Sequence, residues 1–169
     1  PEYRDLLNNP DRPLINRASQ GIYAPASTVK PMLAVMGLNE NAFTDKTRFF
    51  GGPYFQIPNT KRKFRDWRRW GHGWMDVYRA IEISADTFFY DLAYKTGIDT
   101  MNDYMGQFGF GEYTGIDLHE ESSGTMPSRE WKQTRHKQAW YQGDTISVGI
   151  GQGYWTATPL QLARATTIL

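Results

Sequence analysis

Apolar residues between Ser27 and Asn39 recur with the spacing of a helix that buries most of its surface. They are Val29, Met32, Leu33, Val35 and Met36. Pro25 precedes this stretch, and Pro31 falls in its first turn, where a missing N–H costs no hydrogen bond. The pattern therefore predicts a helix with Ser27 at or near its N-terminus, where backbone N–H groups favour negative charge.

The middle of the chain has a second helical pattern with one interruption. Asp76 is a residue type that caps helices, and apolar positions follow from Val77 up to Gly97, a typical helix end. The periodicity is interrupted near residues 84–86. A short amphipathic helix is then predicted over residues 99–107.

Two further helices are predicted in the last third of the chain. Ser128 suits the N-cap of a helix over residues 129–136, and Thr158-Pro159 is a strong start for a helix that runs to the chain end. Between them, residues 143–153 place glycines among apolar residues. This run lacks the Gly-Lys-Ser/Thr ending of a phosphate loop and the spacing of a dinucleotide fingerprint. We therefore predict a strand or turn that passes close to another backbone.

The remaining segments are predicted to be irregular. Residues 1–22 are polar and rich in turn formers, with a short extended piece at residues 14–17. Residues 44–75 contain Gly-Gly-Pro and Ile-Pro-Asn turns, and residues 119–128 are predicted to form a loop.

Composition narrows the classes to consider. A chain of 169 residues can bury one core, so we expect one domain or part of one. The formal net charge of +1 favours no class of partner, and the lack of cysteine excludes disulfides and thiolate metal sites. No apolar run reaches the roughly 18 residues of a membrane span. The chain starts at Pro1 without methionine and stops inside a predicted helix, so we expect fragment boundaries at both ends.

A basic, aromatic run covers residues 61–74. Its cations and tryptophans would suit phosphates and stacked bases, but we favour a solvated basic loop whose tryptophans pack inward. Asp66 and His72 lie in the same run and are two candidate metal ligands. Two ligands without a third or fourth do not make a site.

Ser27 and Lys30 are the first candidates for chemistry. Three residues apart on a helix, their side chains share one face at about 5–6 Å between Cβ atoms. A serine hydroxyl needs a base within hydrogen-bond reach to become a nucleophile, and a lysine can be that base when its surroundings keep it neutral. Alone, the S-x-x-K pattern is weak evidence for catalysis, because a helix that is merely capped by serine and carries a solvated lysine has the same sequence pattern.

Several segments, in order along the chain, resemble the penicillin-recognising serine transpeptidases, and within them the class B, cell-elongation branch. They are residues 23–31 around Ser27 and Lys30, 65–67 with 71–73, 82–90, 113–118, 126–132 and 143–159. Because they cover nearly the whole chain, the ordered set is far more specific than S-x-x-K alone.

The resemblance implies roles for four residues. Ser27 matches the nucleophile that a D-Ala-D-Ala stem peptide or a β-lactam acylates, and Lys30 matches its base. Ser84 matches the second-motif serine that passes a proton toward the leaving group. Asp86 matches a substrate-binding position that is often Asn in the wider family, so the contact made there is expected to differ. No cofactor is implied.

The resemblance also implies an α/β (α+β) penicillin-binding transpeptidase fold, related to the serine β-lactamases. The third family motif, Lys-Thr/Ser-Gly on a strand, is absent, so we expect mainly the helical portion and little of the central antiparallel sheet. Lys95-Thr96-Gly97 matches that motif only as letters, at a predicted helix end. Residues 1–169 are thus expected to be part of one transpeptidase domain, truncated before the third motif.

Some relatives hold a zinc ion beside the active site, using counterparts of Asp66 and His72. Gly51 and Ala85 stand here where those relatives have an acid and a cysteine. We therefore expect no tight zinc site.

The partners that the resemblance implies are peptidoglycan stem peptides, β-lactams and membrane proteins of the elongation complex, such as a SEDS glycosyltransferase. We expect no nucleic acid, a location at the periplasmic face of the bacterial inner membrane, and membrane attachment only through an N-terminal anchor absent from this chain.

Two alternatives share the fold. A penicillin-sensing domain is disfavoured by the loop with residues 65–67 and 71–73. A serine β-lactamase needs a deacylating glutamate, typically in E-x-x-x-N, and neither Glu82 nor Glu130 has Asn four residues later.

Overall fold

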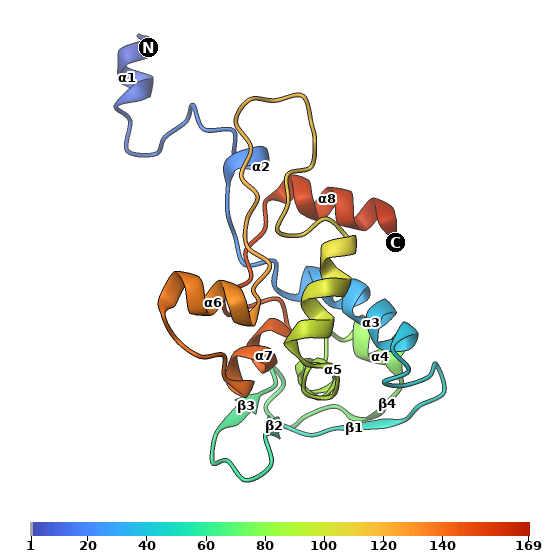
Figure 1. Ribbon diagram of the computed structural model, residues 1–169. Coiled ribbons are helices and arrows are strands. Elements are labelled where there is room, and N and C mark those ends of the chain that lie inside the picture. Colours follow the sequence, from blue (N-terminus) through green and yellow to red (C-terminus); the bar gives the residue numbers. More distant parts are fainter. Residues whose placement is uncertain (1) are drawn as a thin grey trace.

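A computed structural model describes residues 2–169 as short helices and strands around one long central helix, α5 (Figure 1). The helices are α1 (Tyr3–Leu7), α2 (Arg17–Gln20), the 3₁₀ turn η1 (Ala26–Val29), α3 (Lys30–Asn39), α4 (Val77–Glu82), α5 (Asp86–Gln107), α6 (Arg129–His136), α7 (Gln142–Val148) and α8 (Pro159–Ile168). The strands are β1 (Phe49–Gly51), β2 (Tyr54–Gln56), β3 (Lys63–Arg65) and β4 (Gly73–Met75).

Helix α5 is central because it packs against α3 and α7 and also against β2 and β3. Its buried residues include Phe88, Phe89 and Leu92, and those of α3 include Met32 and Met36. Helical geometry is interrupted at Gly97, where φ is 79° and ψ is 165°. The predicted break at this glycine is therefore confirmed, and Lys95-Thr96-Gly97 lies on a helix rather than a strand.

Three predicted helix starts are confirmed by their caps. The Asp76 side chain accepts from the Arg79 N–H at 2.9 Å, and the Ser128 hydroxyl accepts from the Trp131 N–H at 3.0 Å. Thr158 accepts from the Gln161 N–H at 3.1 Å, and the Gln161 side chain accepts from the Thr158 N–H at 2.9 Å, which completes a capping box. Such caps contribute about 1 kcal/mol each.

The prediction that residues 44–75 are irregular is wrong. Strands β1 and β4 form an antiparallel pair with Phe50 opposite Trp74, and β2 and β3 form another with Phe55 opposite Phe64. Each strand is only three residues long, which is too short for an alternating pattern to show in the sequence. The turns between them hide the pairing further.

One smaller prediction fails and another holds only in part. Residues 14–17 are not an extended piece, because Asn16 caps α2 by accepting from the Ala18 N–H at 3.1 Å. The run 143–153 was predicted to be a strand or turn, but residues up to Val148 belong to α7, and only residues 149–151 and 153 form turns. The close backbone approach predicted for this run is confirmed at Gly151, which contacts Ala26.

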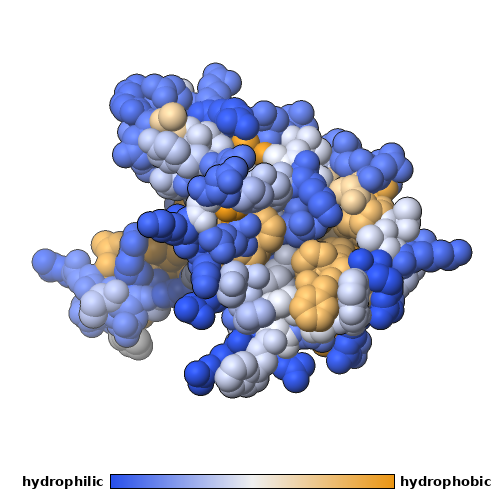
Figure 2. Space-filling model, turned by 90° about the horizontal axis from the view of Figure 1, so that it is seen from below, coloured by the Kyte–Doolittle hydropathy of each residue, from blue (hydrophilic) through white to orange (hydrophobic). Residues whose placement is uncertain are grey.

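The tryptophans of the basic loop do not pack inward, contrary to prediction. Trp67, Trp70 and Trp74 are 64%, 79% and 63% exposed. Trp74 stands edge-on to the exposed Phe50 at 5.5 Å between ring centres. Figure 2, which views the molecule from below, shows separate hydrophobic patches on a mostly hydrophilic face.

In the described part of the chain, residues 2–169, no helix is both long enough and apolar enough to cross a bilayer.

Candidate active site

Three of the four predicted site residues line one open cleft, and the fourth lies directly behind it. Ser27, Ser84 and Asp86 form its walls together with Trp67 and Gln152. Further lining residues are Glu82, Ile83 and Ile150. The structure therefore brings the predicted site residues together at one cleft, and the sequence gave no sign that Gln152 shares it.

Ser27 is exposed in η1, immediately before helix α3. The predicted position near a helix N-terminus is confirmed, although the turn itself is 3₁₀ rather than α-helical. Thr28 steadies this turn by donating from its hydroxyl to the Pro25 carbonyl at 2.6 Å. The nucleophile candidate is thus presented to solvent at the point where free N–H groups gather.

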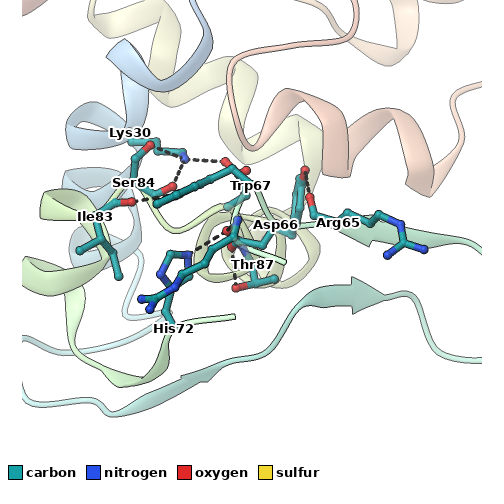
Figure 3. A network of polar contacts seen from close by, with 11 residues as sticks. Lys30, Arg65, Asp66, Trp67, His72, Ile83, Ser84 and Thr87 are labelled. Atoms are coloured by element: carbon teal, nitrogen blue, oxygen red, sulfur yellow. Dashed lines mark hydrogen bonds and ion pairs between the residues drawn. The ribbon is translucent and has the colours of Figure 1, made fainter. Parts of the chain in front are cut away.

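Lys30 is buried, and its ammonium binds the second motif (Figure 3). Nζ donates to the Ser84 hydroxyl and carbonyl, both at 2.9 Å, and to Asp86 Oδ1 at 2.6 Å. The Lys30 backbone N–H donates to the Ser27 carbonyl, but across residues 2–169 no hydrogen bond joins the Lys30 ammonium to the Ser27 hydroxyl. The structure therefore couples Lys30 directly to Ser84 and Asp86, and places Ser27 one turn away along the same chain segment.

Ser84 sits in the sharp turn between α4 and α5. Its φ is +53°, a left-handed conformation that is uncommon for a residue with a side chain. The turn is closed by the Ser84 N–H on the Ile81 carbonyl at 3.1 Å, and the next residue, Ala85, is fully buried. Such strain persists where the surroundings over-determine a conformation, and it clusters at functional sites.

Two neighbouring residues of the basic loop hold both sides of this turn. The Trp67 indole N–H donates to the Ile83 carbonyl at 3.1 Å. Asp66 Oδ2 accepts from the N–H and the hydroxyl of Thr87 at 3.0 and 3.1 Å, at the start of α5. Asp66 and Trp67 therefore fix the backbone on either side of Ser84. Sequence reasoning considered Asp66 only as a metal ligand and missed this role.

The Asp66 carboxyl has a pKa below its usual value of 3.8. Burial alone would raise this pKa, but N–H donors from Thr87 and Arg68 and the neighbouring His72 together outweigh burial. His72 Nε2 lies 2.8 Å from Asp66 Oδ1. A carboxylate with this many donors is a structural anchor.

Tyr90 lies close to the same network and is held in its neutral form. Burial raises the pKa of its hydroxyl, and the negative charges of Asp86 and Asp66 raise it further. Its O–H donates to the Arg65 carbonyl at 3.2 Å, which ties α5 to β3.

The residues present do not fit the zinc site that the resemblance suggests near Asp66 and His72. Both oxygens of Asp66 are taken by hydrogen bonds, and neither Gly51 nor Ala85 offers a ligand atom. A side chain at Gly51 would overlap the methyl group of Met75, which fills that space. Within residues 2–169, no group of three or more acidic or histidine side chains is arranged to hold a metal ion.

Comparison with known proteins agrees with this geometry. Residues 2–169 match the transpeptidase family described as the penicillin binding protein transpeptidase domain, and the chain belongs to this family. The resemblance and the fold class predicted from the sequence are thereby confirmed.

Within the family, the chain is similar to the peptidoglycan D,D-transpeptidase MrdA of Escherichia coli K12. The two are 58% identical over 168 residues, which cover 99% of this chain and 26% of the relative. The same enzyme of Acinetobacter baumannii is 52% identical over 99% of this chain and 25% of its own length. The chain thus spans about a quarter of the length of the curated relatives it matches.

Solved structures show the same likeness. A crystal structure of Pseudomonas aeruginosa PBP2 in complex with WCK 5153 superimposes with a TM-score of 0.95 at 48% identity, covering 98% of this chain and 36% of that one. A complex of PBP2 and MreC from Helicobacter pylori gives a TM-score of 0.89 at 37% identity, covering 95% of this chain and 30% of that one.

Proposed function

We propose that the intact protein containing this chain is a serine D,D-transpeptidase that cross-links peptidoglycan stem peptides during cell elongation. The observation that carries the proposal is the buried Lys30, which bonds both Ser84 and Asp86 directly behind the cleft that Ser27 lines. Family membership over residues 2–169 and the names of the relatives support the same reaction.

The reaction begins with Ser27. Its hydroxyl oxygen attacks the carbonyl between the last two D-alanines of a stem peptide, and its proton passes to Lys30. The peptide bond then breaks, and the departing D-alanine amine receives a proton through Ser84, which bonds Lys30 at 2.9 Å. An amine of a second stem peptide releases the acyl group from Ser27 and completes the cross-link. A β-lactam follows the first half only, because its leaving amine stays tethered in the opened ring.

Lys30 must be neutral to accept the proton from Ser27, so its ion pair with Asp86 has to be given up before the attack. We propose that the third family motif lies in a part of the polypeptide outside this chain. Its lysine would disfavour a charged Lys30 by like-charge repulsion. Its strand would add an N–H group to the oxyanion site near Ser27, a contribution worth about 10²–10³ in rate.

A hydrolytic β-lactamase is the less supported alternative. Glu82 is the glutamate best placed to act as a deacylating base, because it lines the cleft. Its carboxylate pairs with Arg79 at 2.7 Å, and its side chain is 66% exposed. A base that activates water is expected to be held beside the acyl group, so we favour a long-lived acyl-enzyme.

The test is mass spectrometry after incubation with a β-lactam such as mecillinam. We expect a covalent mass gain on Ser27 in the intact protein, lost in Ser27→Ala, and little or none in residues 1–169 alone. Near-normal labelling of the isolated chain would contradict the proposed need for the third motif. Labelling of the intact protein elsewhere than Ser27 would contradict the proposed function itself, and rapid loss of the adduct would favour the hydrolase.

For the partners, we propose the elongation machinery at the periplasmic face of the inner membrane. One similar structure is a complex of PBP2 with MreC from Helicobacter pylori, and another is of a peptidoglycan synthase complex, with structural coordination of polymerization and crosslinking. Co-purification of the intact protein with an MreC homologue or a membrane glycosyltransferase from the same cells would support this. Its absence under conditions that preserve a known complex would count against it.

A further inference from the structure

The segment before Ser27 is held from the far end of the chain. The Ala26 N–H donates to the Gly151 carbonyl at 2.8 Å. Two residues upstream of Pro25, Tyr23 exchanges two backbone hydrogen bonds with Ala157, at 3.0 and 2.8 Å. The Ser27 turn therefore rests on the backbone between α7 and α8, about 125 residues away along the chain.

Gly151 is the point of closest approach. Its φ is +70°, and a Cβ there would overlap the Ala26 carbonyl oxygen and lie 2.8 Å from both the Ala26 carbonyl carbon and its nitrogen. All three are backbone atoms, so they cannot move aside as a flexible side chain would. Position 151 thus requires glycine both for its backbone conformation and for the space.

Ala26 itself is strained. Its φ is +50°, a left-handed conformation that is unfavourable for a residue with a side chain. Such a conformation persists only when neighbours impose it, and here the neighbour is Gly151. The direction in which the chain enters η1, and hence where the Ser27 oxygen points, depends on this turn.

We propose that Gly151 is a positioning residue for Ser27. Its carbonyl and its lack of a side chain lock Ala26 in the left-handed conformation and so aim the nucleophile into the cleft. The assignment of Ser27 as nucleophile rests on the proposed function, whereas the lock itself does not.

The matched pair of variants is Gly151→Ala and Gly153→Ala in the intact protein. Both glycines have a φ of +70°, so both changes impose the same backbone strain. A Cβ at Gly153 would lie 3.1 Å from the Ser147 side chain and 4.0 Å from backbone atoms of Asp144 and Ser147, and the Ala26 backbone is not among its nearest neighbours. Rates of acylation by a fluorescent penicillin, measured over a range of concentrations, separate the acylation rate constant from the affinity of the initial complex.

We expect Gly151→Ala to lower the acylation rate constant on the order of 100-fold, because a displacement of about 1 Å is enough for such a loss. Affinity of the initial complex should change less than about threefold, since aim matters for bond formation more than for binding. Gly153→Ala should acylate within about threefold of the natural protein. Equal acylation rates for the two variants would overturn the proposal.

Ala26→Val provides a second test if Gly151→Ala does not fold. It leaves Gly151 intact but places a β-branched residue at positive φ, so it should slow acylation in the same way. Normal acylation by Ala26→Val would contradict the lock.

Hydrogen exchange at the Ala26 amide tests the geometry without enzyme activity. We expect this amide to be protected in the natural protein and in Gly153→Ala, and to exchange faster in Gly151→Ala. An unprotected amide in the natural protein would overturn the lock. A protein that shows the expected protection but no label on Ser27 would overturn the proposed function and leave the lock standing.

Discussion

Lys30 and Lys132 are the two buried lysines among residues 2–169, and each binds an aspartate at the same distance. Lys30 lies 2.6 Å from Asp86, and Lys132 lies 2.6 Å from Asp144. Both lysine side chains are only 2% exposed, while their aspartates are 15% and 21% exposed. As ion pairs they are nearly identical, so any difference in what they do has to come from their neighbours.

The neighbours of Lys30 can exchange protons, and those of Lys132 mostly cannot. Lys30 also binds the Ser84 hydroxyl, beside a cleft open to a substrate. Lys132 instead lies among the rings of Trp140, Tyr141 and Tyr154, at 5.9, 4.6 and 5.4 Å from their centres. Aromatic faces attract a cation but accept no proton.

Lys132 is therefore a structural tie between α6 and α7. Its partner Asp144 also accepts from the Tyr141 N–H at 2.9 Å and so takes part in the cap of α7. Burial lowers the pKa of Lys132, but the hydrogen bond and charge of Asp144, with the nearby tyrosines, raise it above the ordinary value of 10.5 overall. The comparison shows that a buried lysine–aspartate pair is not by itself a sign of catalysis.

We expect the largest effect on the acylation rate, which should fall when Lys30 is replaced and stay nearly unchanged when Lys132 is replaced. Lys30→Met is expected to lower the rate at which a β-lactam acylates Ser27 in the intact protein by about 10²–10⁴, the range for losing a general base. Lys132→Met is the matched control, because it removes the same group from an equally buried pair, and it should acylate within about threefold of the natural protein. A comparable loss in both variants would mean that the pairs do not differ as described. Rates of labelling by a fluorescent penicillin provide the measurement.

The next largest effect is on stability, which should fall when Lys132 is replaced. Removing one partner of a buried pair costs roughly 3–5 kcal/mol, but Asp144 stays partly open to water, so we expect Lys132→Met to lower the free energy of unfolding by about 2 kcal/mol. For a chain of this size that corresponds to a fall in Tm of about 4–8 °C. Thermal unfolding followed by circular dichroism measures it. An unchanged Tm would show that Lys132 does not tie α6 to α7.

The distance along the chain between interacting residues explains which features could be predicted from the sequence. The caps at Asp76, Ser128 and Thr158 were predicted because each involves residues three apart. The bond of Asp66 to Thr87 spans 21 residues and that of Lys30 to Asp86 spans 56, so neither follows from local spacing. Ser27 and Lys30 were first singled out by their local spacing, whereas Ser84 and Asp86 were predicted only through family resemblance, which reflects long-range pairing. No sequence motif comparable to S-x-x-K indicates that Lys132 pairs with Asp144.

A smaller effect on stability concerns the aromatic cage of Lys132, which is formed by the rings of Trp140, Tyr141 and Tyr154. Tyr154→Leu should remove one ring from Lys132 and cost about 1 kcal/mol, within the range of a partly desolvated cation–π contact. Tyr154→Phe is the matched control, since it keeps the ring, and it should cost much less. Chemical denaturation of both variants measures the difference. If the two variants are equally destabilised, the hydroxyl rather than the ring accounts for the loss.

The smallest effect is the pH dependence of the Lys132 tie. Its pKa is raised in the folded protein, so the stability it contributes is fully present below the unfolded value of 10.5 and is lost as pH rises through the folded value. The difference in unfolding free energy between the natural protein and Lys132→Met should therefore stay constant from neutral pH to about 10.5 and shrink above it. Tyr90, whose raised pKa weakens the fold in the same alkaline range, is present in both proteins and cancels in this difference. A difference that shrinks well below pH 10.5 would mean that Lys132 loses its proton early. In that case the hydrogen bond and charge of Asp144, together with the nearby tyrosines, would not hold the charge on Lys132.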